Sequence, residues 1–441
     1  MARKRVLSPQ SVWDEPALRA AFEEHGIKAL HIPVLYRYLT RHPEAQWEDV
    51  PDLPKAAVAL LRRSFAAYTT RVVHTSRSGD GDALKMLLRL QDGLQVESVV
   101  MRYEPAGPAE EAAEAAAEAR PRARSTLCVS SEVGCQMGCT FCATGTMGLT
   151  ADLTAGEIVE QLVQARRVVA GEEVGDVGDV GGEAEASTSG AAAENGPAHY
   201  AARPGDATRN GAEARGGASE RQSPTSPPTK PAHDPLPSIR NVVFMGMGEP
   251  LNNYAAVRAA IALMTDPSAF ALRRSAVTLS TVGVVPRIRQ LAADLPGVSL
   301  ALSLHAPTQE LRARIVPSAR AYPLPRLMAA VAEYQAASGR RVFVEYVALG
   351  DVNCRPEHAH ALGRLLEGRD APAPEQLRAF SGILRREYAL PVTVRQEKGQ
   401  DVAGACGQLV LEHGGRAGEG RGGFFKLADL EDLVARPAAV C

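Results

Sequence analysis

Apolar residues recur at two different spacings in the first part of the chain. Apolar side chains three to four positions apart, such as Val58, Leu61 and Phe65, predict helices over residues 17–24 and 54–68. From residue 70 the pattern changes to short extended runs separated by Gly-containing turns, which predicts strands at 71–75, 83–90 and 94–102. We therefore predict an N-terminal accessory domain over residues 1–104, in which a helical unit packs beside a β-meander.

A second pattern occupies much of the remaining chain, where strand-like apolar runs alternate with helical stretches. Strands are expected at residues 125–131, 241–245, 277–281, 298–303 and 342–347. The helix after the first of these strands begins with a capping box, Thr154-Ala-Gly-Glu157, and carries an apolar stripe over residues 158–169. This alternation predicts an α/β fold of parallel βα units, which bind ligands at the carboxyl ends of their strands.

Three segments lack either pattern. Residues 105–124 are rich in Ala, Glu, Arg and Pro, which predicts a solvated linker. Residues 171–238 consist mainly of Gly, Ala, Glu, Ser and Pro. Because such a segment buries too little apolar surface to offset the entropy cost of ordering, we predict a disordered insert. The main domain then comprises residues 125–170 and 239–412, and a C-terminal tail follows at 413–441.

Composition narrows the class of protein only slightly. Hydrophobic residues make up 45% of the chain, enough for a folded core, and the net charge of -2 neither indicates nor excludes a nucleic-acid partner. No apolar run reaches the length of about 18 residues that a membrane span needs, and the basic start lacks an apolar signal core. We expect a cytoplasmic protein without a membrane partner, with an organelle as the alternative. The seven cysteines favour metal binding or thiol chemistry over a disulfide framework.

Three of the cysteines share one short loop. Cys135, Cys139 and Cys142 follow a predicted strand with CxxxCxxC spacing and are flanked by glycines. Soft thiolates that converge from one loop suit an iron–sulfur cluster, and three ligands leave one iron open for a substrate. The alternative at this point is a four-thiolate zinc site in which Cys128 supplies the fourth ligand.

Small residues also form turns at the ends of three successive predicted strands. A glycine turn that ends in a carboxylate can receive an amino group and bring backbone amides close to a small ligand, although such turns are common. Three of them at consecutive strand ends are more informative. They read Gly-Met-Gly248-Glu249-Pro, then Ser280-Thr-Val-Gly, then Ser303-Leu304-His305-Ala-Pro.

Taken in this order, the cysteine loop and the three turns resemble the radical SAM (S-adenosylmethionine) superfamily. Two further motifs narrow the resemblance to the RlmN/Cfr-type RNA adenine methyltransferases: Leu127-Cys128-Val-Ser-Ser before the cysteine loop, and Gly-Ala-Cys406-Gly-Gln-Leu near the end. The similarity covers residues 30–409 apart from the insert. It implies a partial (β/α) radical SAM barrel preceded by the accessory domain.

The resemblance also implies cofactors and residue roles. Cys135, Cys139 and Cys142 would bind a [4Fe-4S] cluster. Cys406 would carry the methyl group as methyl-cysteine, Cys128 would release the RNA adduct by forming a disulfide with it, and Glu97 would be the proton acceptor. S-adenosylmethionine would be bound through Gly248, Glu249, Ser280, Ser303, Leu304 and His305.

The implied substrate is an adenine of large-subunit (23S-type) rRNA, with tRNA as a second candidate. Carbon 2 is favoured over carbon 8 because that branch of the family is the commoner one. The resemblance further implies an electron donor such as flavodoxin or ferredoxin, and we expect a monomer. Four basic residues of the accessory domain could contact RNA phosphates, although scattered basic residues usually form solvated surface: Arg62, Arg63, Arg71 and Lys85.

Several of these assignments have simpler alternatives. Cys406 is also compatible with a buried inert thiol, the commonest fate of a free cysteine. Glu97 is compatible with a solvated charge at a strand edge, and His305 with a structural histidine at a strand end.

One family feature is missing from the sequence. The strand that normally follows the helix at residues 357–366, together with its S-adenosylmethionine contact, has no counterpart before the next predicted helix at 375–387. We predict that the chain is a splice form or gene-model variant of an active enzyme, with weakened S-adenosylmethionine binding. Closure of the sheet by residues 391–395 is one alternative. A catalytically impaired RNA-binding or assembly protein of the same fold is the other. Independently of this strand, a zinc-binding structural protein is a third hypothesis for the whole chain.

Overall fold

The computed structural model describes residues 5–103, 124–171, 238–350 and 352–366, together with 383–384 and 387–388. The chain separates into two compact units. One of them, Val177–His233, lies outside the described residues, and the other, Met1–Asp176 with Asp234–Cys441, contains all of them. Most of the predicted linker and insert, and all of the predicted tail, also fall outside the described residues. Within them, no helix combines the length and hydropathy that crossing a membrane requires.

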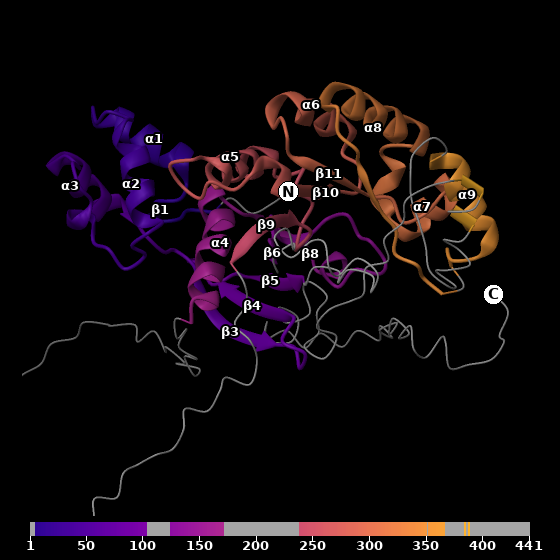
Figure 1. The fold of residues 1–441 in the computed structure, drawn as a ribbon, viewed down its shortest axis with the longest axis horizontal. Coiled ribbons are helices and arrows are strands. Elements are labelled where there is room, and N and C mark those ends of the chain that lie inside the picture. Colours follow the sequence, from indigo (N-terminus) through magenta and orange to yellow (C-terminus); the bar gives the residue numbers. More distant parts are fainter. Residues whose placement is uncertain are drawn as a thin grey trace, which may run out of the picture. The chain divides into compact units, whose positions relative to one another are not determined.

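A sheet of eight strands organises the described residues (Figure 1). Its strand order is β12-β11-β10-β9-β6-β5-β4-β3. In this sheet, β6, β9, β10, β11 and β12 run parallel to one another, whereas β3, β4, β5 and β6 pair antiparallel. The strands are β3 (Arg71–Arg77), β4 (Ala83–Arg89), β5 (Gln95–Tyr103), β6 (Arg124–Cys128), β9 (Ile239–Phe244), β10 (Val277–Thr281), β11 (Ser299–Ser303) and β12 (Phe343–Glu345).

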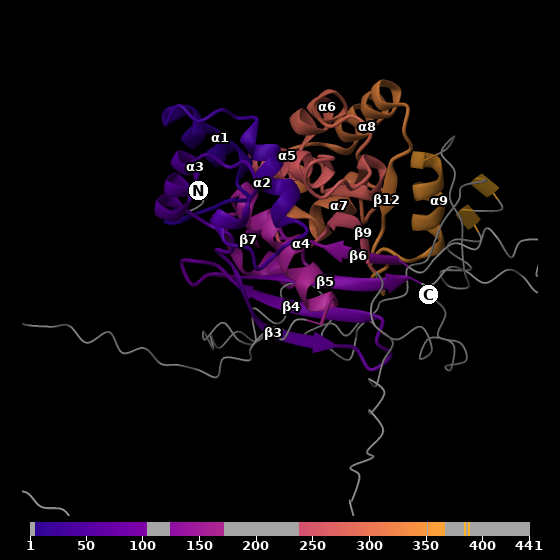
Figure 2. The same ribbon diagram turned by 60° about the vertical axis from the view of Figure 1, so that its left-hand side comes forward.

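The predicted β-meander is present, but it does not form a layer of its own beside the helices. Its last strand, β5, pairs with β6 from Val99 opposite Cys128 to Tyr103 opposite Arg124. The meander therefore extends the parallel sheet, as Figure 2 shows for β3, β4, β5 and β6. The sequence could not reveal this pairing because the 20 residues between β5 and β6 are too many for the short hairpin turn that would mark the two strands as neighbours.

Helices pack on one face of the parallel strands. The βα connections supply α4 (Ala155–Val169), α5 (Tyr254–Thr265), α6 (Val285–Asp294), α7 (Gln309–Ile315), α8 (Leu324–Ser338) and α9 (Pro356–Leu366). Short 3-10 helices occur at η1 (Trp47–Asp49), η3 (Thr144–Thr146), η4 (Arg274–Ala276) and η5 (Pro317–Arg320). The capping box predicted for α4 is confirmed, because the Glu157 amide donates to Thr154 Oγ1 at 3.1 Å and the Thr154 amide donates to Glu157 Oε2 at 2.9 Å.

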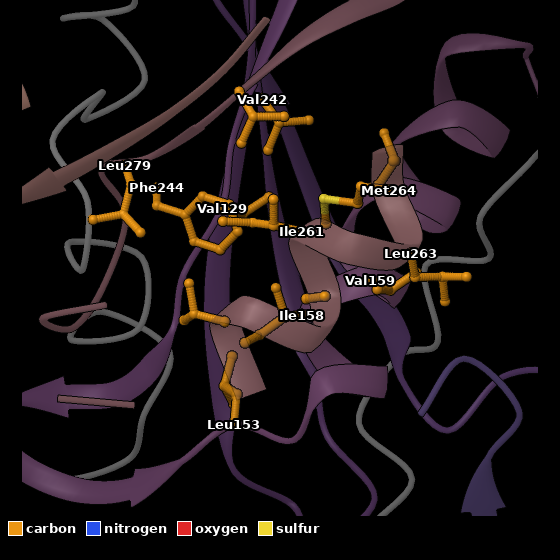
Figure 3. Close-up of a cluster of buried hydrophobic side chains, with 14 of the residues drawn as sticks. Val129, Leu153, Ile158, Val159, Val242, Phe244, Ile261, Leu263, Met264 and Leu279 are labelled. Carbon is orange, nitrogen blue, oxygen red and sulfur yellow. The ribbon is translucent and has the colours of Figure 1, made fainter. Parts of the chain in front are cut away.

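The core between sheet and helices is apolar and closely packed. Figure 3 shows Val242 and Phe244 of β9 and Leu279 of β10 facing Ile158 of α4 and Ile261 of α5. All five side chains are buried. Burying such a side chain fully contributes about 1.5–3 kcal/mol. Because side chains alternate along a strand, this packing assigns the other face of the sheet to the intervening residues.

The N-terminal helical unit comprises β1 (Gln10–Ser11), α1 (Glu15–Glu24), α2 (His31–Leu39), α3 (Lys55–Ser64) and β2 (Phe65–Ala66). The helix predicted over residues 54–68 ends at Ser64, because the next two residues pair in parallel with β1. The unit is joined to α4 by the buried carboxylate of Glu160. That carboxylate accepts hydrogen bonds from Ser11, Thr69 and Thr70.

Candidate active site

The cysteine loop connects the two strands of a small antiparallel hairpin, β7 (Glu132–Cys135) and β8 (Gly148–Asp152). Cys135 is the last residue of β7, while Cys139 and Cys142 lie in the loop, where the Cys142 amide donates to the Cys139 carbonyl at 3.2 Å. The neck of the hairpin requires glycine at position 134. Its φ is +79°, and a Cβ there would lie 1.8 Å from the carbonyl oxygen of Gly148.

The three cysteine thiols of this loop are chemically suited to bind an iron–sulfur cluster. Cys135 and Cys139 are buried, Cys142 is half-buried, and none of the three forms a disulfide. Burial raises the pKa of both Cys135 and Cys139 to about 12, so a cation is needed to bind them as thiolates. Within the described ranges, no three His, Cys, Asp or Glu side chains converge closely enough to hold a metal ion, either with Cys128 or without it.

The cysteine loop rests on α7 and on the turn after β11. The amide of Thr140 donates to the carbonyl of Ile315 at 2.9 Å, at the end of α7. The ring of Phe141 meets the ring of His305 edge-on, with centroids 4.8 Å apart. Cys139 packs in a small apolar cluster that includes Leu311 and Ile315. These contacts fix the loop against the carboxyl ends of the parallel strands.

The segment between β6 and β7 is bonded to the Gly-Met-Gly248-Glu249 turn. Met247 donates its amide to Ser130 Oγ at 2.9 Å, and Glu249 donates its amide to Glu132 Oε2 at 2.9 Å. Gly248 has φ +102°, and a Cβ there would approach the Glu132 side chain to 2.6 Å. This turn therefore needs glycine both for its backbone conformation and for its contact with Glu132.

Glu249 links this turn to the next one. Its buried carboxylate accepts the amides of Leu251 at 3.0 Å and Val282 at 2.9 Å. Burial raises the pKa of Glu249 to about 7, an increase that these hydrogen bonds oppose. Both oxygens thus already bond to backbone, so in the described structure Glu249 holds two strand ends together.

Glu132 was not among the site residues that the sequence indicated. Its side chain is fully buried, and its Oε1 has no hydrogen-bond partner. Burial raises the pKa of Glu132 to about 8, and Asp152 and Glu249 add to this increase. A glutamate three residues before a cysteine gives no sequence signal of this kind, because its burial depends on the turn at Gly248.

Several predicted residues share the face of the sheet opposite the helices. Cys128 pairs with Val99 on β5 and with Val243 on β9, and Val243 pairs in turn with Thr278, two residues before Ser280. Because residues two apart on a strand share a face, Cys128 and Ser280 face the same way. Ser303 joins them, since its hydroxyl lies 3.1 Å from that of Ser280.

Glu97 lies on this same face, two residues from Val99, and it is not a solvated edge charge. Its Oε2 lies 3.0 Å from Nζ of Lys85, and both side chains are 0% exposed. The alternative of an exposed strand-edge glutamate is therefore wrong. The expectation that Lys85 contacts RNA phosphates is also wrong, because its ammonium group is buried in this ion pair.

His305 has a structural role in the described residues, as its simpler alternative suggested. It adopts φ +60°, its Nδ1 accepts the amide of Val347 at 3.2 Å, and its carbonyl accepts from Asn353 Nδ2 at 2.7 Å. Burial lowers the pKa of His305 to about 3, and the charge of Arg312 acts in the same direction, so the ring is neutral. The neighbouring Leu304 is buried, and its amide donates to the carbonyl of Glu345 at 3.0 Å.

Two further predictions that bear on the site lie outside the described residues, as does the alternative closure of the sheet by residues 391–395. Cys406, the expected methyl carrier, is one of them, so its approach to Cys128 remains a prediction. The missing strand after Leu366 is the other, because residues 367–382 are not described. The helix before that point is confirmed at Pro356–Leu366.

A cysteine loop set against glycine and serine turns, at the carboxyl ends of five parallel strands in the described chain, defines a radical SAM-type protein. No protein-family model matches the chain. A crystal structure of a radical SAM methyltransferase from Sphaerobacter thermophilus is similar, with a TM-score of 0.65 and 29% identity, covering 91% of this chain and 99% of that one.

Curated relatives make the identification specific. The chain is 37% identical to a probable dual-specificity RNA methyltransferase RlmN 2 of Opitutus terrae, over 93% of this chain and 90% of that protein. It is 33% identical to dual-specificity RNA methyltransferase RlmN 1 of Myxococcus xanthus, over 89% and 92%. A ribosomal RNA large subunit methyltransferase N of Nitrosopumilus maritimus is 31% identical, over 88% and 93%. The chain belongs to the RlmN family of radical SAM RNA methyltransferases.

Proposed function

We propose that this protein methylates carbon 2 of an adenine in large-subunit rRNA, and also in tRNA, through a methyl-cysteine. Family membership supports the reaction, since the relatives are named dual-specificity RNA methyltransferases. The observation that carries the proposal is the position of Cys128. This thiol is buried on the sheet face that also carries Ser280 and Ser303, next to the strand ends on which the cysteine loop rests.

The cofactor residues follow from the same arrangement. Cys135, Cys139 and Cys142 would hold a [4Fe-4S] cluster, and the turns after β9, β10 and β11 would bind S-adenosylmethionine. When bound, this pair would supply one-electron radical chemistry at a methyl group. The residues proposed to contact or frame S-adenosylmethionine, through backbone or side chain, are Gly248, Glu249, Ser280, Ser303, Leu304 and His305. The parallel strands β6, β9, β10, β11 and β12 would form a partial barrel around them.

Two thiols and one carboxylate would act in methyl transfer to the RNA and in release of the product. Cys406 would carry the methyl group to the adenine, and Cys128 would release the product by forming a disulfide with Cys406. Glu97 would accept the proton, since it lies on the same face as Cys128 and is held in place by Lys85, whose Nζ is 3.0 Å from its Oε2. We further propose that the protein acts as a monomer with flavodoxin or ferredoxin as its electron donor, and that residues 1–104 serve as an RNA-facing accessory domain.

Mass spectrometry of methyladenosine isomers tests this function. rRNA and tRNA from cells with the protein should contain 2-methyladenosine, and cells that lack it or carry Cys128→Ala should not. Cys354→Ala is the matched control, because Cys354 is a half-buried thiol outside the proposed set of site residues and its loss should leave the modification intact. Formation of 8-methyladenosine alone would overturn the choice of carbon 2. Zinc without iron and sulfide in the anaerobically reconstituted protein would overturn the cluster.

A further inference from the structure

A buried arginine lies between the cysteine loop and the turns proposed to bind S-adenosylmethionine. Arg312 is on α7, and its side chain is 0% exposed. Its Nε donates to the carbonyl of Leu304 at 3.0 Å, and its Nη2 donates to the carbonyls of Ser303 at 3.3 Å and Val282. One guanidinium therefore joins the ends of β10 and β11.

The partners of this guanidinium are dipoles rather than charges. Among the described residues, no carboxylate lies within ion-pair distance of Arg312, and each of its hydrogen bonds goes to a backbone carbonyl. Removing a cation from water without a counter-ion is unfavourable. The protein would not be expected to retain such a charge for packing alone, so an anion at this place would complete the arrangement.

The cysteine loop supplies a candidate for that anion. Cys139 packs against Leu311, the neighbour of Arg312, and the Thr140 amide bonds to the end of α7. The guanidinium of Arg312 and the thiol of Cys139 therefore belong to two segments that pack against each other, while Arg312 hydrogen-bonds to the turns on its other side.

A cysteine loop that holds the cluster would carry a net negative charge. Three thiolates outweigh the positive charge of an oxidised cubane core, and each added electron makes the site more negative. A fixed cation nearby favours the more negative, reduced form, because net charge around a cluster sets its reduction potential. This step rests on the function proposed above.

We propose that Arg312 is a positioning residue whose buried positive charge balances the thiolate-bound cluster and makes its reduction more favourable, while its hydrogen bonds align the turns after β10 and β11. The assignment concerns charge and not only shape. Substitutions that keep both the positive charge and an N–H donor should therefore preserve the reduction potential. Substitutions that keep an N–H donor but remove the charge should lower it.

The test is an EPR-monitored redox titration of the full chain after anaerobic reconstitution. Arg312→Gln keeps a donor without the charge and should make reduction at least tenfold less favourable, a shift of about 59 mV to lower potential for one electron. Arg312→Lys keeps the charge and should stay near the unmodified protein. Arg314→Gln is the matched control, because Arg314 is exposed on the same helix. The cluster of this variant should have the same reduction potential as that of the unmodified protein.

The outcomes separate this inference from the proposed function. If the unmodified chain binds no iron and sulfide, the proposed function fails. If it binds them but Arg312→Gln has an unchanged potential, or Arg312→Lys shifts as much as Arg312→Gln, the inference fails. Arg312→Met provides a second neutral variant should Arg312→Gln not fold. Failure of both neutral variants to fold would assign Arg312 a purely structural role and would overturn the inference.

Discussion

The ammonium nitrogen of Lys85 lies 3.0 Å from Oε2 of Glu97, and neither side chain reaches solvent. The two residues come from neighbouring antiparallel strands, β4 and β5, in which Lys85 pairs with Val99 and Glu97 pairs with Leu87. A buried ion pair contributes little net stability compared with an apolar pair, but loss of one partner leaves an uncompensated charge. The pair therefore makes each residue depend on the other.

Lys85→Met should destabilise the protein by about 3–5 kcal/mol, because it leaves the Glu97 carboxylate buried without its cation. The double variant Lys85→Met with Glu97→Leu should recover most of that loss, since no buried charge remains. Urea unfolding of the single and double variants measures both effects. Equal instability of the double variant and Lys85→Met would show that the packing of the lysine stem matters more than its charge.

Glu132→Gln should change how stability depends on pH. Burial raises the pKa of Glu132 from 4.5 to about 8 in the folded protein, so between these values folding takes up a proton. The stability contributed by the protonated carboxyl is present below the unfolded pKa and is lost as pH rises towards 8. The loss should be on the order of a few kcal/mol, because each pKa unit corresponds to about 1.36 kcal/mol.

Chemical unfolding of the iron-free protein between about pH 5 and pH 8 measures this effect. The unmodified protein should lose stability over the interval, and Glu132→Gln should lose distinctly less. Glu23→Gln, an exposed carboxyl on α1, is the matched control and should follow the unmodified curve. Parallel curves for all three proteins would contradict a buried proton on Glu132.

Gly248→Ala should cost more stability than alanine at an open glycine. Both Gly248, at φ +102°, and Gly93, at φ +82°, have backbone conformations that alanine disfavours. A Cβ at Gly248 would also lie 2.6 Å from the Glu132 side chain, whereas a Cβ at Gly93 would meet nothing within 4 Å. We expect about 1–3 kcal/mol beyond the cost at Gly93 from this added crowding, measured by thermal unfolding. Equal losses for the two variants would show that Glu132 moves aside freely.

The sequence predicted those elements whose bounds are set by local signals. β10 has the predicted bounds, Val277–Thr281, because apolar and polar residues alternate there up to the turn that contains Gly283. α4 begins where its capping box indicates. By contrast, α2 was missed: its N-cap residue, Leu30, makes no side-chain capping hydrogen bond, so no sequence signal marked its start. β1 and β2 contain two residues each and depend on pairing across the chain.

The residues of the candidate site also fall into two groups, those marked by local sequence motifs and those whose position depends on tertiary packing. The cysteines and glycine turns form motifs along the chain, so their positions could be predicted before their contacts. The partners of these motifs could not: an arginine at 312 has the pattern of a solvated helix cation, yet it is buried against three carbonyls. Lys85 was likewise expected at the surface, in contact with RNA, but its side chain is buried in the ion pair with Glu97. Burial of a charged group is set by tertiary packing, which local pattern does not report.

The predicted absence of a strand after Leu366 has a consequence at β12. In the described part of the chain, β12 pairs with β11 on one side only, and its Phe343 is 55% exposed. Unpaired strand edges and exposed apolar side chains reduce stability and favour association. Adding a family-like strand and loop after Leu366 should therefore slow amide exchange at residues 343–345 and tighten S-adenosylmethionine binding. Hydrogen exchange and equilibrium dialysis measure the two effects, with a Gly/Ser insertion of equal length as the control. If the 441-residue chain already shows full stability and activity, or if both insertions act alike, the strand is not missing in any functional sense.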